Sequence, residues 1–272
     1  MKTGFIGIGN MGGAILTGYA SSPKGRKDRI MVCDKRKDVC EKFIKKFPQI
    51  SMTDNVKDLI HGSETVVVGV KPQVIEEVLE AAAQVWNKDK LLISMAAGIS
   101  IDYIRRYLGE DAHIIRIMPN TPAMVGEGMI AVCSDGRSSM KDLDYAMEIL
   151  DTVGKTEVVP EDMIDCVIGV SGSSPAYTYM YIEALVKAAK ANGMTGSQAR
   201  TFAAQAVLGA AKMVMESPES LEQLRINVCS PGGTTIKAVD KLFENGFMED
   251  VEEGFQAAVD RSREMTQEKK LK

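Results

Sequence analysis

Three glycines near the start of the chain have the spacing with the sharpest chemical meaning. They form Gly7-Ile8-Gly9-Asn10-Met11-Gly12, a G-x-G-x-x-G that follows an apolar strand and opens a helix. In that setting the first glycine permits a tight turn, the second lets a pyrophosphate approach the backbone, and the third lets helix and strand pack closely. The N–H groups at the helix start favour the anion. The motif predicts a dinucleotide-binding loop rather than a simple turn.

The type of dinucleotide stays open. Asp34 follows the apolar run Ile30–Cys33, where such a fold places an acid that binds the adenosine ribose, which favours NADH. Lys35 and Arg36 come directly after it, and cations there can bind the 2′-phosphate of NADPH. Alternatively, the basic run is simply the solvated start of a helix.

A second chemical signal lies in the last third of the chain, in the segment from Asn227 to Thr235. It reads Asn-Val-Cys-Ser-Pro-Gly-Gly-Thr-Thr and precedes a helix. We expect the N–H groups of Gly233, Thr234 and Thr235, with the hydroxyls of Ser230 and Thr235, to form a site for a small carboxylate. The alternative is a capped helix after a Pro-Gly turn.

The elements around these motifs predict two domains. Short β-branched runs alternate with helical stretches up to residue 159, which predicts a parallel α/β sheet. The predicted strands are Thr3–Ile8, Ile30–Cys33, Thr65–Val70, Leu91–Ser94, Ile114–Met118, Met129–Cys133 and Thr156–Val159. The predicted helices of this half include Met11–Tyr19, Lys57–His61, Gln73–Val85 and Ile101–Leu108. We therefore expect a Rossmann-type dinucleotide-binding domain over residues 1–160.

Residues 161–272 are predicted to form an all-α domain. Its expected helices are Pro175–Asn192, Ser197–Glu216, Leu221–Val228, Thr235–Asn245 and Met248–Lys269. The first two are apolar around most of their circumference, so they must be covered on several faces. About a hundred residues cannot cover them, and we expect a second subunit to do so in a two-fold dimer.

Composition narrows the function class. The chain has 272 residues and a net charge of -4, which disfavours nucleic-acid binding as a main role. Five widely spaced cysteines without a C-x-x-C suggest neither a disulfide framework nor a metal site, so a cytoplasmic location is expected. No apolar run has membrane-spanning length. Small metabolites are the expected partners.

Six motifs in order carry a family resemblance. They are Gly4 to Gly12, Val70-Lys71-Pro72, Ser94 to Ser100, Arg116 to Pro122, Ser171 to Tyr177 and Val228 to Thr235. On these the chain resembles the pyrroline-5-carboxylate reductases, from Thr3 to Gln267. The resemblance implies a Rossmann domain plus a helical dimerisation domain, dimers that often assemble into pentamers of dimers, and NAD(P)H-dependent reduction of 1-pyrroline-5-carboxylate to L-proline, the last step of proline biosynthesis.

The resemblance also implies roles for single residues. Cofactor contacts fall on Gly7, Ile8, Gly9, Asn10, Met11, Gly12, Asp34, Arg36, Asn55, Val70, Lys71, Pro72, Ala97 and Asn227. Substrate contacts fall on Glu161, Ser230, Gly233, Thr234 and Thr235. The chain departs from the family at Ser174, where a glycine is usual, and at Cys229, where Ser or Thr is common.

Thr235 is the expected catalytic residue, with its hydroxyl hydrogen-bonded to the ring nitrogen of the imine as hydride arrives. No histidine acid is needed, and His113 is expected to be structural. Arg116 is expected to pair near the sheet edge. Glu161 has an alternative role at a helix start, where acids favour the helix dipole.

Two other functions remain open from the sequence. A dehydrogenase of 3-hydroxy acids would use a lysine on the interdomain helix, such as Lys187 or Lys190. A dinucleotide sensor without catalysis would bind cofactor and reduce nothing. The first leaves the Ser230 to Thr235 loop without a purpose, and the second leaves the Ser230 and Thr235 hydroxyls unused.

Overall fold

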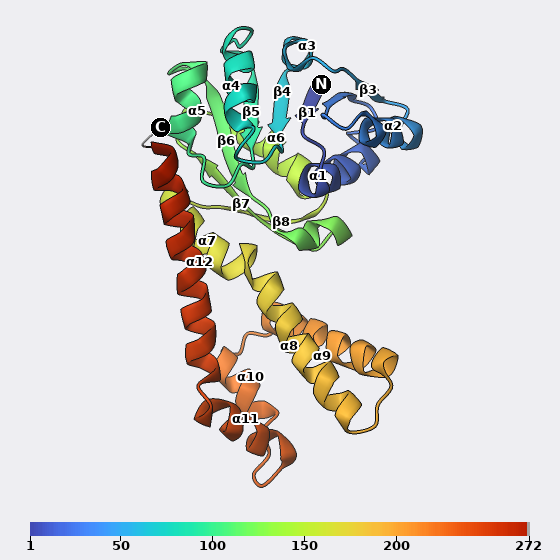
Figure 1. Cartoon of the computed structure of the whole chain (residues 1–272), viewed down its shortest axis with the longest axis vertical. Coiled ribbons are helices and arrows are strands. Elements are labelled where there is room, and N and C mark those ends of the chain that lie inside the picture. Colours follow the sequence, from blue (N-terminus) through green and yellow to red (C-terminus); the bar gives the residue numbers. More distant parts are fainter. Residues whose placement is uncertain (271–272) are drawn as a thin grey trace. The chain divides into compact units, whose positions relative to one another are not determined.

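One eight-stranded sheet organises the first part of the chain. The structure, a computed structural model, describes residues 1–270. The strand order is β3-β2-β1-β4-β5-β6-β7-β8 (Figure 1). The strands are β1 (Lys2–Ile6), β2 (Arg29–Cys33), β3 (Ile50–Met52), β4 (Thr65–Val68), β5 (Leu91–Ser94), β6 (His113–Met118), β7 (Gly128–Ser134) and β8 (Gly154–Val158). This order, reversing direction between β1 and β4, is that of a dinucleotide-binding sheet.

The sheet differs from the predicted one in two respects. β7 pairs antiparallel with β6, with Arg116 opposite Cys133, whereas every other neighbouring pair of these strands is parallel. The prediction of a wholly parallel sheet was therefore wrong at this pair. The three-residue β3 was not predicted.

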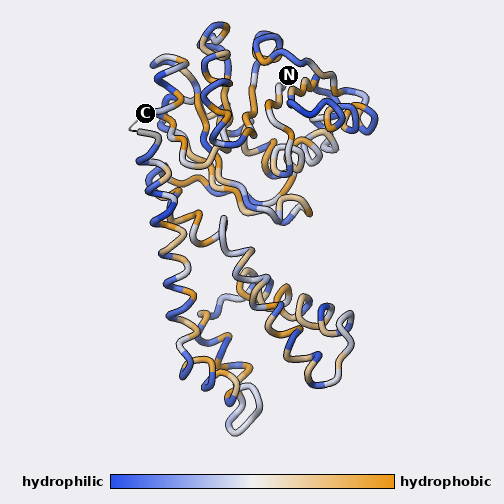
Figure 2. Tube along the Cα trace, in the orientation of Figure 1, coloured by the Kyte–Doolittle hydropathy of each residue, from blue (hydrophilic) through white to orange (hydrophobic). Residues whose placement is uncertain are grey.

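Helices cover both faces of the sheet. On one face α1 (Asn10–Ser21), α2 (Lys37–Lys46) and α6 (Met140–Leu150) contribute Leu16, Cys40 and Ile149 to one buried cluster. On the other, α3 (Val56–Gly62), α4 (Ile75–Ala83) and α5 (Ile101–Leu108) contribute to a second cluster. The central strands β4 and β5 are buried and apolar along most of their length (Figure 2), as expected of strands covered on two sides, whereas the edge strand β8 is largely exposed.

The chain divides into two compact units. Among the described residues, one unit comprises 1–173 and 258–270, and the other comprises 174–257. The boundary predicted after residue 160 lies where the strand pattern ends, but the first unit continues through a 3₁₀ turn (Glu161–Met163), α7 (Ile164–Val167) and a π-helical turn (Ile168–Gly172). Ile164 is 1% exposed in the second core cluster, which explains why this segment stays with the sheet.

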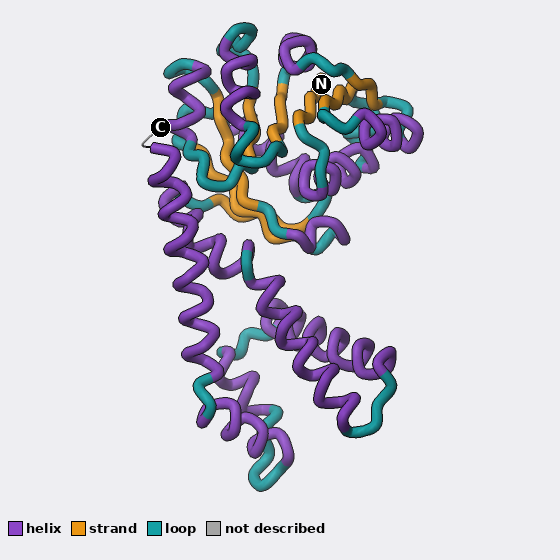
Figure 3. The backbone as a smooth tube through the Cα atoms, viewed as in Figure 1, coloured by secondary structure: helices purple, strands orange, loops and turns teal. Residues whose placement is uncertain are grey.

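The second unit is helical (Figure 3). Its helices are α8 (Ser174–Ala191), α9 (Gly196–Glu216), α10 (Leu221–Asn227), α11 (Thr234–Glu244) and the first part of α12 (Phe247–Lys270). Thr195 caps α9 through a capping box with Gln198, and Ser220 caps α10 by accepting from the N–H of Gln223. The five predicted helices match these within a residue or two.

The two longest helices wholly within this unit leave their apolar surface open. Within α8, all of whose residues are described, none is buried, and in α9 only Ala199 and Ala203 are. Met180 is 67% exposed and Phe202 66%. The expectation that this chain cannot cover its own apolar helices is confirmed. Among residues 1–270 no helix is long and apolar enough to cross a membrane.

Candidate functional site

The glycine loop is held by close backbone approaches. Gly7 has φ +80, a conformation that side chains strongly disfavour, and its N–H donates to the carbonyl of Cys33 at 2.8 Å. A Cβ on Gly12 would lie 2.2 Å from the Gly7 carbonyl oxygen. The first and third glycines are thus required by the protein itself, as the motif predicts.

Gly9 is different, because the protein around it leaves room. A Cβ there would meet only the Nη2 atom of Arg36, at 3.8 Å. Gly9 is the N-cap of α1 and offers no side-chain cap, so the first N–H groups of the helix are left without side-chain acceptors. The open space and the free donors together fit a phosphate group.

A cavity of about 790 Å³ opens beside this loop. It lies at the carboxyl ends of β1, β2 and β4, where the strand order reverses and ligands bind in open α/β sheets. A Cβ on Gly69, which follows β4, would lie 2.7 Å from the carbonyl oxygen of Gly7. The close approach of Gly7 and Gly69 beside the cavity therefore requires a residue without a side chain at position 69. Of the expected cofactor residues, its lining includes Gly7, Gly9, Asn10, Met11, Asp34, Arg36, Val70 and Lys71. The residues present fit a dinucleotide.

Asp34 is fixed in place by two backbone donors. Its Oδ2 accepts from the N–H of Ile8 at 2.8 Å, and its Oδ1 accepts from the N–H of Arg36 at 2.9 Å. The side chain is only 10% exposed. The carboxylate therefore links the glycine loop to the start of α2, at the position expected for a ribose contact.

Six of the expected cofactor residues are not among those that line this cavity: Ile8, Gly12, Asn55, Pro72, Ala97 and Asn227. Asn55 is the N-cap of α3, its Oδ1 accepting from the N–H of Lys57 at 2.9 Å. Its neighbour Val56 lines the cavity instead. Pro72 follows Lys71, and Ala97 lies in the loop after β5. Ile8 and Gly12 belong to the glycine loop, but they do not line the cavity either.

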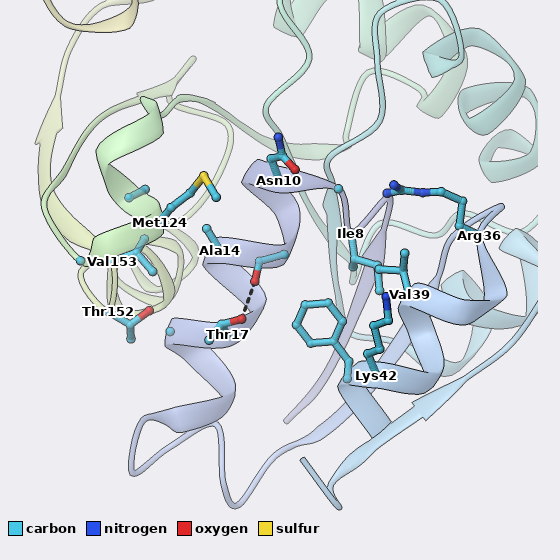
Figure 4. A pocket seen from close by; sticks show the side chains of 16 residues that line it. Ile8, Asn10, Ala14, Thr17, Arg36, Val39, Lys42, Met124, Thr152 and Val153 are labelled. Carbon is cyan, nitrogen blue, oxygen red and sulfur yellow. Dashed lines mark hydrogen bonds between the residues drawn. The ribbon is translucent and has the colours of Figure 1, made fainter. Parts of the chain in front are cut away.

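A second, smaller cavity of about 490 Å³ flanks the outer side of α1. In Figure 4, Ala14 and Thr17 of α1 lie between Val39 and Lys42 of α2 on one side and Met124 and Val153 on the other. It shares Gly9, Asn10 and Arg36 with the larger cavity but not Asp34 or the residues after β4. The larger cavity therefore fits a dinucleotide better.

The loop before α11 forms the predicted helix-start site, with one correction. The N–H of Gly233 donates to the Ser230 carbonyl at 3.0 Å, so this N–H is not free for a ligand as predicted. Thr234 and Thr235 are the first residues of α11, so their N–H groups have no carbonyl acceptor one turn earlier in the helix. A Cβ on Gly233 would lie 2.4 Å from the Ser230 hydroxyl, so only glycine lets that hydroxyl lie against the helix start.

Glu161 is engaged within the first unit. Its Oε1 accepts from the Nη1 of Arg116 and from the N–H of Ile101, both at 2.8 Å. Arg116 is 5% exposed, so the expectation of a structural pairing for this arginine is confirmed. The ion pair and the capped N–H together account for Glu161 without a substrate.

Asn227 ends α10, and both ends of its amide are used there. Its Nδ2 donates to Glu219 at 2.7 Å, and its Oδ1 accepts from Gln223 at 2.8 Å. These bonds hold the segment that leads into the Ser230 loop.

Comparison with known proteins decides the family. Residues 161–265 match the family model for pyrroline-5-carboxylate reductase dimerisation, and residues 2–98 match that for coenzyme F420-dependent NADP oxidoreductases. The pyrroline-5-carboxylate reductase of Escherichia coli is 42% identical over 97% of this chain and 98% of its own. The chain belongs to the pyrroline-5-carboxylate reductase family.

Solved structures of this family agree in fold. The pyrroline-5-carboxylate reductase of Coxiella burnetii is 34% identical, with a TM-score of 0.90 over 97% of this chain and 98% of its own. The Plasmodium falciparum pyrroline carboxylate reductase, solved with NADP bound, is 29% identical, with a TM-score of 0.86 over 98% of both chains. Membership makes this chain an NAD(P)-dependent oxidoreductase with a Rossmann-type unit and a dimerisation unit.

Sequence reasoning missed some residues that shape the cavity. Gly69 was not singled out, although a glycine between a buried strand and Val70-Lys71 is a signal for close backbone approach. Glu77, on α4, also lines the cavity and pairs with Lys35 at 3.3 Å. Its position in the first turns of a helix gave no sign of this, because acids are common there.

Proposed function

We propose that this chain reduces 1-pyrroline-5-carboxylate to L-proline with NADPH or NADH, as the last step of proline biosynthesis. The observation that carries the proposal is the 42% identity to a pyrroline-5-carboxylate reductase over nearly the whole chain. It is supported by the glycine cradle at the sheet's switch point and by the open helix start at Thr234.

The proposed substrate site is the loop before α11. The N–H groups of Thr234 and Thr235, with the Ser230 hydroxyl, would hold the single carboxylate of the imine at a helix N-terminus, where an anion is favoured. Gly233 contributes by its lack of a side chain rather than by its N–H. Glu161 remains a weaker candidate for substrate contact, because its carboxylate already has two partners.

Thr235 is the proposed catalytic residue. Bound NAD(P)H would supply a hydride to the carbon of the protonated imine, whose nitrogen keeps that proton in the amine of proline. The hydroxyl of Thr235 would donate a hydrogen bond to the ring nitrogen or accept one from its protonated form, which orients the ring for that addition. The hydroxyl has no hydrogen-bond partner in the described chain, so it is available for this role.

The proposed cofactor site is the cavity lined by Asp34, Arg36 and Lys71. Asn55, Pro72 and Ala97 are retained as cofactor contacts only on the family resemblance, and so is Asn227, whose amide is already bonded within its own unit. We further propose a homodimer that can assemble into a pentamer of dimers. A cytoplasmic location is proposed from the five cysteines, which are all free thiols.

The test follows oxidation of NADH and NADPH separately in the presence of 1-pyrroline-5-carboxylate. Thr235→Ala should lower kcat/KM by roughly 10²- to 10⁴-fold, as expected for loss of a positioned hydrogen-bonding group. Thr235→Ser is the matched variant, because it keeps the hydroxyl and should retain most activity. Near wild-type turnover in the alanine variant would remove Thr235 from the mechanism, and no turnover by the wild type would remove the proposed reaction.

A further inference from the structure

Five charged side chains line the proposed dinucleotide cavity, and two of them are carboxylates that oppose a phosphate there. The five are Asp34, Lys35, Arg36, Lys71 and Glu77. We propose that Glu77 on α4 sets the discrimination between NADPH and NADH, because it holds Lys35 in an ion pair that the 2′-phosphate must break. The inference rests on the proposed use of a dinucleotide and adds a specificity-determining residue to that site.

Asp34 is fixed in the cavity and cannot move away from a ligand. Both of its carboxylate oxygens accept backbone N–H groups, from Ile8 and Arg36, and the side chain is almost buried. A carboxylate fixed at the ribose position suits two free hydroxyls and repels a phosphate. Binding of a 2′-phosphate therefore depends on how many cations nearby are free to meet it.

Arg36 is one available cation. Its Nε lies 3.5 Å from Asp34, at the limit of a hydrogen bond, and the side chain is 60% exposed. Its guanidinium lies beside Gly9, at the start of the glycine loop. This arginine can turn toward a phosphate without breaking a strong contact.

Lys35 is the second cation, and it is engaged. Its Nζ lies 3.3 Å from the Oε2 of Glu77, which joins the loop after β2 to α4 along the cavity wall. Both side chains are largely exposed, and such pairs are weak enough for a dianionic phosphate to exchange with the carboxylate. Without Glu77, the ammonium group of Lys35 could meet the phosphate without first giving up a carboxylate partner.

The experiment measures binding and needs no turnover. Isothermal titration calorimetry at low salt compares 5′-AMP with adenosine 2′,5′-bisphosphate (2′,5′-ADP), which differ only in the 2′-phosphate. Glu77→Gln should tighten binding of 2′,5′-ADP by roughly fivefold, the factor that corresponds to about 1 kcal/mol, and change the affinity for 5′-AMP less than twofold. The gain should shrink in high salt, where exposed charges are screened.

Two further variants separate the proposed route from a general charge effect. Glu80→Gln removes the same charge from an exposed position on the same helix outside the cavity lining, and should change neither affinity. Lys35→Gln should weaken 2′,5′-ADP, and in that background Glu77→Gln should have little further effect. A gain from Glu80→Gln equal to that from Glu77→Gln, or a full gain without Lys35, would overturn the inference.

The same titrations distinguish this inference from the proposed function. If the wild type binds both fragments and Glu77→Gln leaves their affinity ratio unchanged, the role of Glu77 is wrong and the dinucleotide site stands. If the wild type binds neither fragment, the dinucleotide site and the role of Glu77 fail together.

Discussion

Single residues differ in how much of their role the sequence reveals. The roles of Gly7 and Gly12 follow from spacing alone, because the backbone contacts that exclude a Cβ are local to one strand, turn and helix. The pairing of Lys35 with Glu77 joins residues 42 positions apart, and no local pattern encodes it. The same holds for Glu161, whose two partners come from α5 and β6.

Gly9 and Gly12 should respond differently to alanine. Gly12→Ala should lower the melting temperature, because its Cβ would overlap the Gly7 carbonyl oxygen. Gly9→Ala should melt near the wild type, since only the mobile end of Arg36 is near, yet weaken binding of NADPH and NADH about tenfold or more by blocking the phosphate. Thermal denaturation and fluorescence titration of the cofactor check this; normal cofactor binding by Gly9→Ala would contradict it.

Glu161 offers a test between a structural and a substrate role. Removing its carboxylate leaves the guanidinium of Arg116 buried without its ion-pair partner and the N–H of Ile101 without an acceptor. Glu161→Ala should therefore lower the free energy of unfolding by about 3 kcal/mol while KM for the imine changes little. Denaturant unfolding and steady-state kinetics separate the roles. A raised KM with unchanged stability would return Glu161 to the substrate site.

At the scale of elements, the length of one connection explains why the prediction of a wholly parallel sheet failed. Residues 119–127 link β6 to β7 through a 3₁₀ segment, Thr121–Val125. A parallel crossover needs about a dozen residues or more, so this connection is too short for one and β7 runs antiparallel. That signal was present in the sequence. β3, with only three residues, has too little pattern to be predicted alone.

α6 begins with a pH-dependent capping box, in which the N–H and the hydroxyl of Ser139 donate to the carboxylate of Asp142. Burial alone would raise the pKa of Asp142, but hydrogen bonds from Ser139 and the contact with His113 hold it below its usual value. A carboxyl with a lowered folded pKa contributes stability above its unfolded pKa of about 3.9, and this is lost as pH falls through the folded pKa. Asp142→Asn should remove that contribution.

Thermal denaturation between pH 6 and pH 3 checks the cap. Asp142→Asn should be less stable than the wild type at pH 6, and the difference should narrow as the pH falls below about 4. The other carboxylates titrate in both proteins and largely cancel from the comparison. A gap that stays constant across this range would show that the charge of Asp142 is not what stabilises the helix start.

At the scale of the whole molecule, the sequence indicated an incomplete helical unit. α8 and α9 carry apolar residues on more faces than their own unit covers, which the structure shows as exposed Tyr179, Met180 and Phe202. The match of residues 161–265 to a dimerisation family agrees with a homo-oligomer. The extent of assembly beyond a dimer leaves no comparable trace in one chain, because it depends on contacts between copies.

Phe202→Glu should weaken the dimer, because it places a charge on the exposed apolar surface of α9. Light scattering after size exclusion should then show monomer at micromolar concentrations where the wild type is larger. Met140→Glu is the matched control, an equally exposed apolar residue on α6 outside the dimerisation match. The sheet-bearing unit should fold in both variants, so calorimetry with 5′-ADP should give similar affinities. An unchanged mass for Phe202→Glu would place the interface on another face of the helices.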